Sequence, residues 1–165
     1  MNKIIVLFLL FVFTLTSCHD DNDDKVALTH TTFNFSHNWD GLPVTNSDFN
    51  NLKFTNENGE LLSIERFRYL ISKITFHKLD GSQTVLEGYN LVDLTNNENL
   101  SFTSTSFLTT GTYSDVTFTF GFNNEDNLNN YAALNSASWN VPAMLGGGYH
   151  YMKLEGKYLK DSLTA

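Results

Sequence analysis

The strongest constraint on the fold is a stretch in which apolar and polar residues alternate strictly. Its apolar members are Val116, Phe118, Phe120 and Phe122, separated by single polar or glycine residues. A period of two is typical of a strand with one buried face. No long window has a capped helical period apart from a short turn at 128–134, and 14 Phe and 7 Tyr against 2 Pro suit aromatic sheets. We therefore predict an all-β, antiparallel, sandwich-like domain.

Turn signals and a change of parity divide the rest of the chain. We expect a first half-buried strand over 31–37 that ends at Asp40-Gly41, a turn at 56–59, and a hairpin at Asp80-Gly81. Within 65–77 the apolar positions switch from odd to even numbers. This switch predicts a β-bulge near Ser72, or two strands that meet at a corner.

The N-terminus resembles a bacterial lipoprotein signal. An unbroken run of ten apolar residues, 4–13, is too short for a membrane-spanning helix, which needs about 20, but has the length of a signal-peptide core. Leu15-Thr16-Ser17-Cys18 then resembles a lipobox ending at the only cysteine. We expect a signal peptide over 1–17, lipidation of Cys18, a tether over 18–27 and a β domain over 28–165. An ordinary secretory signal followed by an unrelated cysteine is the alternative.

The tether is acidic, with Asp20, Asp21, Asp23 and Asp24 close together. Such a run is typical of a solvated linker, and it also resembles the signals that send Bacteroidota lipoproteins to the cell surface. We expect a protein anchored to the outer membrane through Cys18 and exposed at the surface. A net charge of −8 disfavours nucleic acid as a partner. Because Ala165 follows a strand-like segment directly, we expect a chain truncated at its C-terminus.

Enzyme signatures are missing from the sequence. It contains no Gly-x-Ser-x-Gly, no His-Glu-x-x-His and no phosphate-binding loop motif. Acylation of Cys18 would remove the only candidate thiol nucleophile. No helical pattern follows Gly146-Gly147-Gly148, so these glycines favour a bend or a close backbone approach over a phosphate cradle. We expect a protein that is not an enzyme.

Two histidines stand out because they share parity with apolar residues. His37 falls in step with the phenylalanines of the first predicted strand, and His150 with Met152 and Leu154. Both are therefore expected to point toward apolar faces. Each is either a core histidine with a backbone hydrogen bond or a ligand of a borderline metal such as copper. The pattern leaves both interpretations open.

Five segments in this order resemble the MbnP-like domain of bacterial lipoproteins, which is common in Bacteroidota. They are FNFSHNWDGLPV, IERFRYLISKITFHKLDG, YNLVDL, GTYSDVTFTFGF and GGGYHYMKLEGKY, and they span Phe33 to Tyr158. The resemblance implies a secreted, β-rich, copper-binding protein with histidine ligands and an oxidised tryptophan beside the metal. It also implies a dihaem oxidase of the cytochrome type as a partner that makes this modification.

Carried over to this sequence, the resemblance places the early histidine ligand at His37. It leaves Trp39 and Trp139 as the candidates for the oxidised or neighbouring tryptophan. The chain departs from the family in two respects: His150 replaces a residue that is often apolar, and no histidine follows it. Our hypothesis is a surface lipoprotein that binds copper through His37 and His150 without catalysis. The alternative is a metal-free adhesion or glycan-binding module in which exposed Tyr and Trp rings contact the partner.

Overall fold

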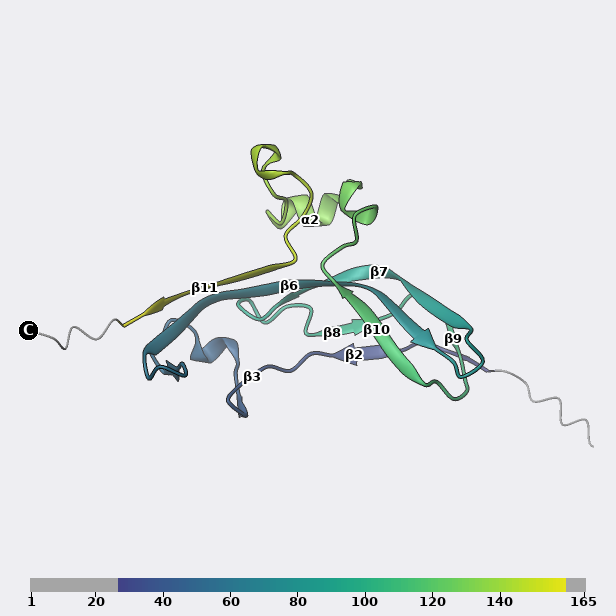
Figure 1. Cartoon of the computed structure of the whole chain (residues 1–165), viewed down its shortest axis with the longest axis horizontal. Coiled ribbons are helices and arrows are strands. Elements are labelled where there is room, and N and C mark those ends of the chain that lie inside the picture. Colours follow the sequence, from purple (N-terminus) through teal and green to yellow (C-terminus); the bar gives the residue numbers. More distant parts are fainter. Residues whose placement is uncertain (1–26, 160–165) are drawn as a thin grey trace, which may run out of the picture.

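The computed structural model of the chain describes residues 27–159 (Figure 1). The expected signal peptide, the lipidated Cys18 and all but the last residue of the tether lie outside this range. No helix within it is long and apolar enough to cross a membrane. The elements are β1 (Leu28–Thr29), β2 (Thr32–Asn34), β3 (Asn38–Trp39), β4 (Leu42–Pro43), η1 (Asn46–Asp48), β5 (Phe54–Thr55), β6 (Leu61–His77), β7 (Gln83–Asp93), β8 (Ser101–Thr103), β9 (Leu108–Thr109), β10 (Asp115–Phe120), η2 (Asp126–Leu128), α2 (Ala132–Ser136), η3 (Ala143–Leu145) and β11 (Met152–Tyr158).

The long strand β6 is the axis of a five-stranded antiparallel sheet. Tyr69 pairs with Val92 of β7 and with Met152 of β11, so these two strands occupy opposite edges of β6. By the same reasoning β5 lies on the β7 edge, and β10 lies on the β11 edge. Strands β10 and β11 therefore follow one another along a single edge of β6.

Two β-bulges set the parity of β6. The predicted bulge is confirmed by a register shift between Ser72 and Ile74, where Lys73 adopts a φ of 47°. A second shift, opposite Glu155 and Gly156, leaves Glu65 as an extra residue. Each extra residue reverses the alternation of side chains. The two reversals keep one row of apolar side chains on the same face along β6, namely Leu62, Ile64, Phe67, Tyr69, Ile71, Ile74 and Phe76, whereas Leu70 lies on the other face.

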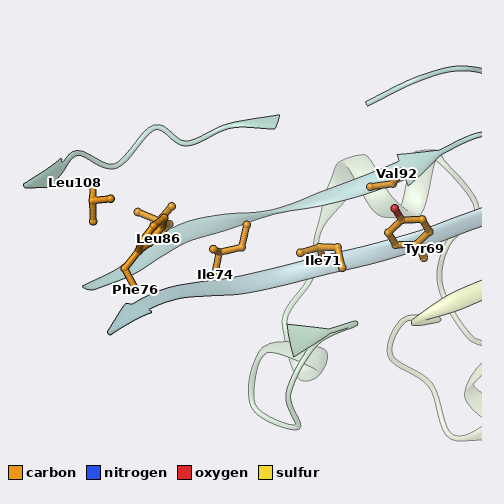
Figure 2. Packing of buried hydrophobic residues seen from close by; sticks show 7 residues of the cluster. All are labelled: Tyr69, Ile71, Ile74, Phe76, Leu86, Val92 and Leu108. Atoms are coloured by element: carbon orange, nitrogen blue, oxygen red, sulfur yellow. The ribbon is translucent and has the colours of Figure 1, made fainter. Parts of the chain in front are cut away.

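The core lies between that face and a second layer of short strands. Figure 1 shows β2, β3 and β8 beneath β6, where the two-stranded pairs β1–β9, β2–β8 and β3–β4 form. Figure 2 shows one buried cluster, formed by Tyr69, Ile71, Ile74, Phe76, Leu86, Val92 and Leu108. A second cluster consists of Val44, Phe49, Phe54, Ile64 and Leu94. The predicted sandwich-like all-β domain is confirmed.

The opposite face of the sheet is covered by the segment between β10 and β11. This segment carries α2 and stands above β6 in Figure 1. Its Leu134 and Trp139 pack on Leu70 of β6 and Leu91 of β7. The three glycines before β11 lie in a bend, as expected: all three have positive φ, and a Cβ on Gly148 would lie 2.5 Å from the Asn127 side chain.

Turns formed where they were expected, but two strand expectations were wrong in part. Turns occur at Asp40-Gly41, at 56–59 and at Asp80-Gly81. The first strand was expected to reach residue 37, but β2 ends at Asn34.

The alternation of β10 is real, yet its apolar face is not covered. Val116, Phe118 and Phe120 are 44%, 59% and 45% exposed. Phe122 does not continue this row, because Gly121 turns the chain at a φ of 92° and Phe122 packs on the other face of the sheet. Local alternation indicates a strand, but it does not show whether a second layer reaches beneath it.

Candidate functional site

His37 lies in the connection between β2 and β3, on the core side of β6. Its carbonyl oxygen accepts a hydrogen bond of 2.9 Å from the Val44 N–H, which ties the β3–β4 hairpin to it. The imidazole meets the rings of Phe67 and Tyr69 edge-on, with centroids 5.4 and 5.6 Å away. Its Nε2 lies 2.9 Å from the Tyr69 hydroxyl oxygen. Two neighbouring inward positions of β6 therefore fix the orientation of the ring.

The environment of His37 favours a neutral imidazole. Burial lowers the pKa of His37 below its usual 6.5, and burial raises the pKa of Tyr69 to about 12. Both groups are therefore uncharged at neutral pH. When Nε2–H donates to the Tyr69 oxygen, the lone pair lies on Nδ1. Metal-binding histidines commonly have this arrangement, in which one ring nitrogen donates to a neighbour and the other binds the metal.

His37 and Trp39 line the same small cavity. The cavity measures about 160 Å³, and Val44, Phe67 and Leu154 contribute to its walls. The Trp39 indole N–H donates to the Thr55 carbonyl oxygen at 3.0 Å and its ring packs on Phe54, with centroids 5.3 Å apart, which fixes the orientation of the indole. The structure thus brings together one predicted histidine and one predicted tryptophan, in a cavity closed on one side by β11.

His150 and Trp139 form a separate pair. The His150 N–H donates to the Trp139 carbonyl oxygen at 3.1 Å, and the two ring centroids lie 5.9 Å apart. Burial and the nearby Lys153 ammonium lower the pKa of His150. His150 was expected on the same face as Met152 and Leu154. The bend at Tyr151 interrupts the alternation, so the imidazole lies on the other face of the sheet.

Trp139 is fully buried and lies beside two cations. The Arg68 guanidinium and the Lys153 ammonium each lie 5.1 Å from the centre of the indole ring. Arg68 is in turn paired with the buried Asp93 carboxylate at 2.8 Å. The indole Nε1 has no hydrogen-bond partner among residues 27–159. The surroundings of Trp139 therefore differ in charge and exposure from those of Trp39.

The two histidines lie on opposite faces of β6. His37 contacts Tyr69, whereas the neighbouring residues Arg68 and Leu70 contact or pack with Trp139. Consecutive residues of a strand point to opposite faces, so the sheet separates His37 from His150. No group of three or more His, Cys, Asp or Glu side chains able to hold a metal occurs within the described range. The described residues therefore provide a single imidazole at each place.

Sequence reasoning missed the partners that position these groups. Tyr69 and Phe67 lie on the apolar parity of β6, which the pattern showed, but nothing local in the sequence indicates that His37 contacts them. The two cations on Trp139 were likewise not expected. Arg68 lies on the face of β6 opposite the main core, and this position is the signal that could have singled it out.

Comparison with known proteins gives one match. A family model described as MbnP matches residues 29–164, nearly all of the expected β domain. Neither the comparison with curated proteins nor the comparison with solved structures gave a match.

Proposed function

Since the chain belongs to the MbnP family, we propose that it binds copper at His37 and has no catalytic activity of its own. The observation that carries the proposal is the half-buried imidazole of His37, which is kept neutral by burial and anchored to Tyr69 through one nitrogen. Imidazole nitrogen is a better ligand for copper than for calcium or magnesium, which prefer carboxylate oxygens. A neutral ring is the form that can bind a metal.

The described residues would supply one ligand of a copper site, the His37 imidazole. His37 would bind through Nδ1, while the Tyr69 oxygen would accept from Nε2–H and hold the ring. His150 lies across the sheet and would not share the ion. The remaining coordination positions would fall to solvent or to a second molecule. A bound copper ion would supply redox chemistry in the cavity that Trp39 also lines.

Trp39 fits the role of an oxidised or neighbouring tryptophan better than Trp139 does. Trp39 lines the cavity of His37, whereas the sheet separates Trp139 from that cavity. Removal of an electron from an indole leaves a positive charge, and the two cations beside Trp139 would oppose that charge. A dihaem oxidase partner, if it acts on this chain, would therefore act at Trp39.

The cellular location belongs to the same proposal. Lipidation of Cys18 would anchor the chain in the outer membrane, with the acidic tether holding the domain away from the lipid and the domain exposed at the cell surface. Mass spectrometry of the N-terminal peptide tests the anchor. A diacylated Cys18 is expected, and an unmodified N-terminus cleaved elsewhere would refute it.

Elemental analysis of copper tests the central claim. The chain from His19 to Ala165 omits the hydrophobic leader and keeps the whole described domain. We expect about one copper per chain, lost in His37→Ala and retained in the matched control His150→Ala. Copper that survives the loss of His37, or that disappears only with His150, would overturn the proposal. Circular dichroism of both variants separates loss of the site from loss of the fold.

A second candidate function has one observation in its favour. A cavity of about 510 Å³ on the α2 side of the sheet is lined by Tyr89, Phe122 and Tyr131 together with polar groups that include Glu87 and Asp126. Aromatic rings beside hydrogen-bonding groups suit sugars, as in the alternative of a glycan-binding module. Affinity electrophoresis in gels with xylan or mannan tests this function. Retardation that Tyr131→Ala abolishes would support it, and unchanged migration of the wild type would exclude these glycans.

A further inference from the structure

We propose that β10 is a self-association edge, at which two copies of this chain pair their β10 strands antiparallel about Phe118. The open edge of the sheet is the starting point. Within residues 27–159, β10 pairs with β6 on one side and with no strand on the other. The Gly121 N–H donates to the Leu70 carbonyl oxygen of β6 at 2.8 Å. Because alternate residues direct their backbone groups to opposite edges, those of Val116, Phe118 and Phe120 point to the open side.

Apolar side chains accompany these free backbone groups. Val116 lies opposite Phe76 and Phe120 opposite Ile71 in the register, so the row faces the same side as the main core. Its three members are roughly half exposed, and Phe118 is the most exposed of them. A strand added at this edge would satisfy the backbone groups and place cross-strand neighbours against the row.

The charge pattern separates β10 from its neighbour along the same edge. Strand β11 carries Lys153, Glu155 and Lys157, and charged side chains on an edge strand oppose the addition of another strand. From Val116 to Phe120, β10 has no charged residue and no proline. Of the two strands on this edge, β10 is therefore the one left without such protection.

The sequence of β10 is complementary to itself. Antiparallel pairing about Phe118 places Phe118 opposite its own copy and Val116 opposite Phe120 on the apolar face. On the other face it places Thr117 opposite Thr119. Aromatic pairs, aromatic pairs with β-branched residues, and Thr–Thr pairs are the cross-strand combinations that stabilise sheets. Asp115 falls opposite Gly121, so no like charges meet. This self-complementarity is why we assign a second copy, and not an unrelated strand, to the edge.

The expected dimer is weak. One pair of six-residue strands buries less than the roughly 1,600 Å² of a standard protein interface. The chain also carries a net charge of −8, so the two copies repel each other at long range. Dimerisation should therefore depend on concentration and strengthen as salt is added.

Sedimentation velocity on the chain from His19 to Ala165 is the first test. We expect a shift from monomer to dimer between roughly 1 μM and 1 mM. Phe118→Lys and Phe118→Glu should each remain monomeric, because like charges would meet at the symmetry axis. An equimolar mixture of the two should dimerise again, because Lys then faces Glu. Leu154→Lys is the matched control on β11, since Leu154 is 53% exposed on the same edge, and it should dimerise like the wild type.

Cross-linking tests the register independently. The chain from His19 lacks Cys18, the only cysteine, so Phe118→Cys introduces a single thiol. Directly opposite residues in a hydrogen-bonded pair have Cα atoms about 5.5 Å apart, within reach of a disulfide. Phe118→Cys should form disulfide dimers under mild oxidation. Val116→Cys should not, because Val116 faces Phe120, but it should cross-link when mixed with Phe120→Cys.

Two results would overturn the proposal. The first is a wild type that remains monomeric over the whole concentration range, which would leave the edge to another occupant. The second is a dimer that Leu154→Lys abolishes while Phe118→Lys leaves it intact, because the contact would then lie on β11.

Discussion

Gly156 is the residue at which a single methyl group should disturb the fold most. It lies on β11 opposite the second bulge of β6, at the register shift next to Glu155. A Cβ atom at this position would lie 1.9 Å from the Ser63 carbonyl oxygen, 3.0 Å from the Ser63 carbonyl carbon and 3.4 Å from the Ile64 Cα. All three atoms belong to the backbone of the partner strand, so no side-chain rotation can relieve the overlap.

The magnitude follows from what must move. Gly156→Ala has to push β11 away from β6 at Ser63, which weakens the neighbouring ladder hydrogen bonds. Overpacking usually costs about 1–3 kcal/mol, and with a displaced backbone we expect a free energy of unfolding lowered by about 2–4 kcal/mol. For a domain of this size that corresponds to a fall of roughly 6–16 °C in Tm.

The assay is thermal and urea unfolding followed by circular dichroism, with Gly41→Ala as control. Gly41 lies in the β3–β4 turn at a φ of 78°, and a Cβ atom there would have nothing within 4 Å, so alanine meets backbone strain but no clash. Its cost should stay at about 1 kcal/mol. Equal losses in the two variants, or a loss below about 1 kcal/mol for Gly156→Ala, would refute the argument that space decides at this position.

Three further predictions concern the histidines and the buried ion pair. Tyr69→Phe keeps the ring and removes the hydrogen bond to His37, so the free energy of unfolding measured in urea should fall by about 1–2 kcal/mol. The same change made in the His37→Ala variant should cost clearly less, because the hydrogen-bond partner is already gone. Equal costs in the two backgrounds would contradict the coupling between Tyr69 and His37. Burial holds the pKa of His37 and of His150 below 6.5 in the folded state, so the unfolded state binds more protons just below pH 6.5. The free energy of unfolding should therefore fall as the pH drops through 6.5. A variant with both histidines changed to alanine should lose this dependence, and an unchanged slope of unfolding free energy against pH would contradict the prediction. Asp93→Asn leaves Arg68 buried without its carboxylate and should cost about 3–5 kcal/mol by the same urea assay, where a cost under about 1 kcal/mol would count against a structural ion pair.

Features set by neighbouring residues were predictable from the sequence. The parity switch between Ile71 and Ile74 indicated the bulge, because an extra residue must reverse the side-chain alternation. The Asp40-Gly41 turn was predictable because both residues tolerate positive φ, and they adopt it at 49° and 78°. The short second bulge at Glu65 escaped notice, since the apolar residues before it are too few to establish a parity.

Features set by distant residues were not predictable in the same way. The side of the sheet on which His150 lies depends on the bend at Tyr151, where the Leu70 N–H donates to the Tyr151 carbonyl oxygen. The contact between His37 and Tyr69 joins residues that are 32 positions apart. The exposure of Phe118 depends on how far the second layer extends. In each of these cases the deciding partner comes from another element, so a local pattern carries no information about it.

The placement of β11 also has a consequence for the order in which the molecule is completed. Gly156 pairs with Ile64 and Tyr158 with Leu62, so this strand closes a loop of more than ninety residues. Long-range pairings of this kind form late, because the entropy of loop closure opposes them. Leu154 of the same strand forms one wall of the His37 cavity. A chain that emerges N-terminus first would therefore present His37 and Trp39 early, but it would enclose them only after β11 has paired with β6. During that interval the pair would be more open to solutes than it is in the folded domain.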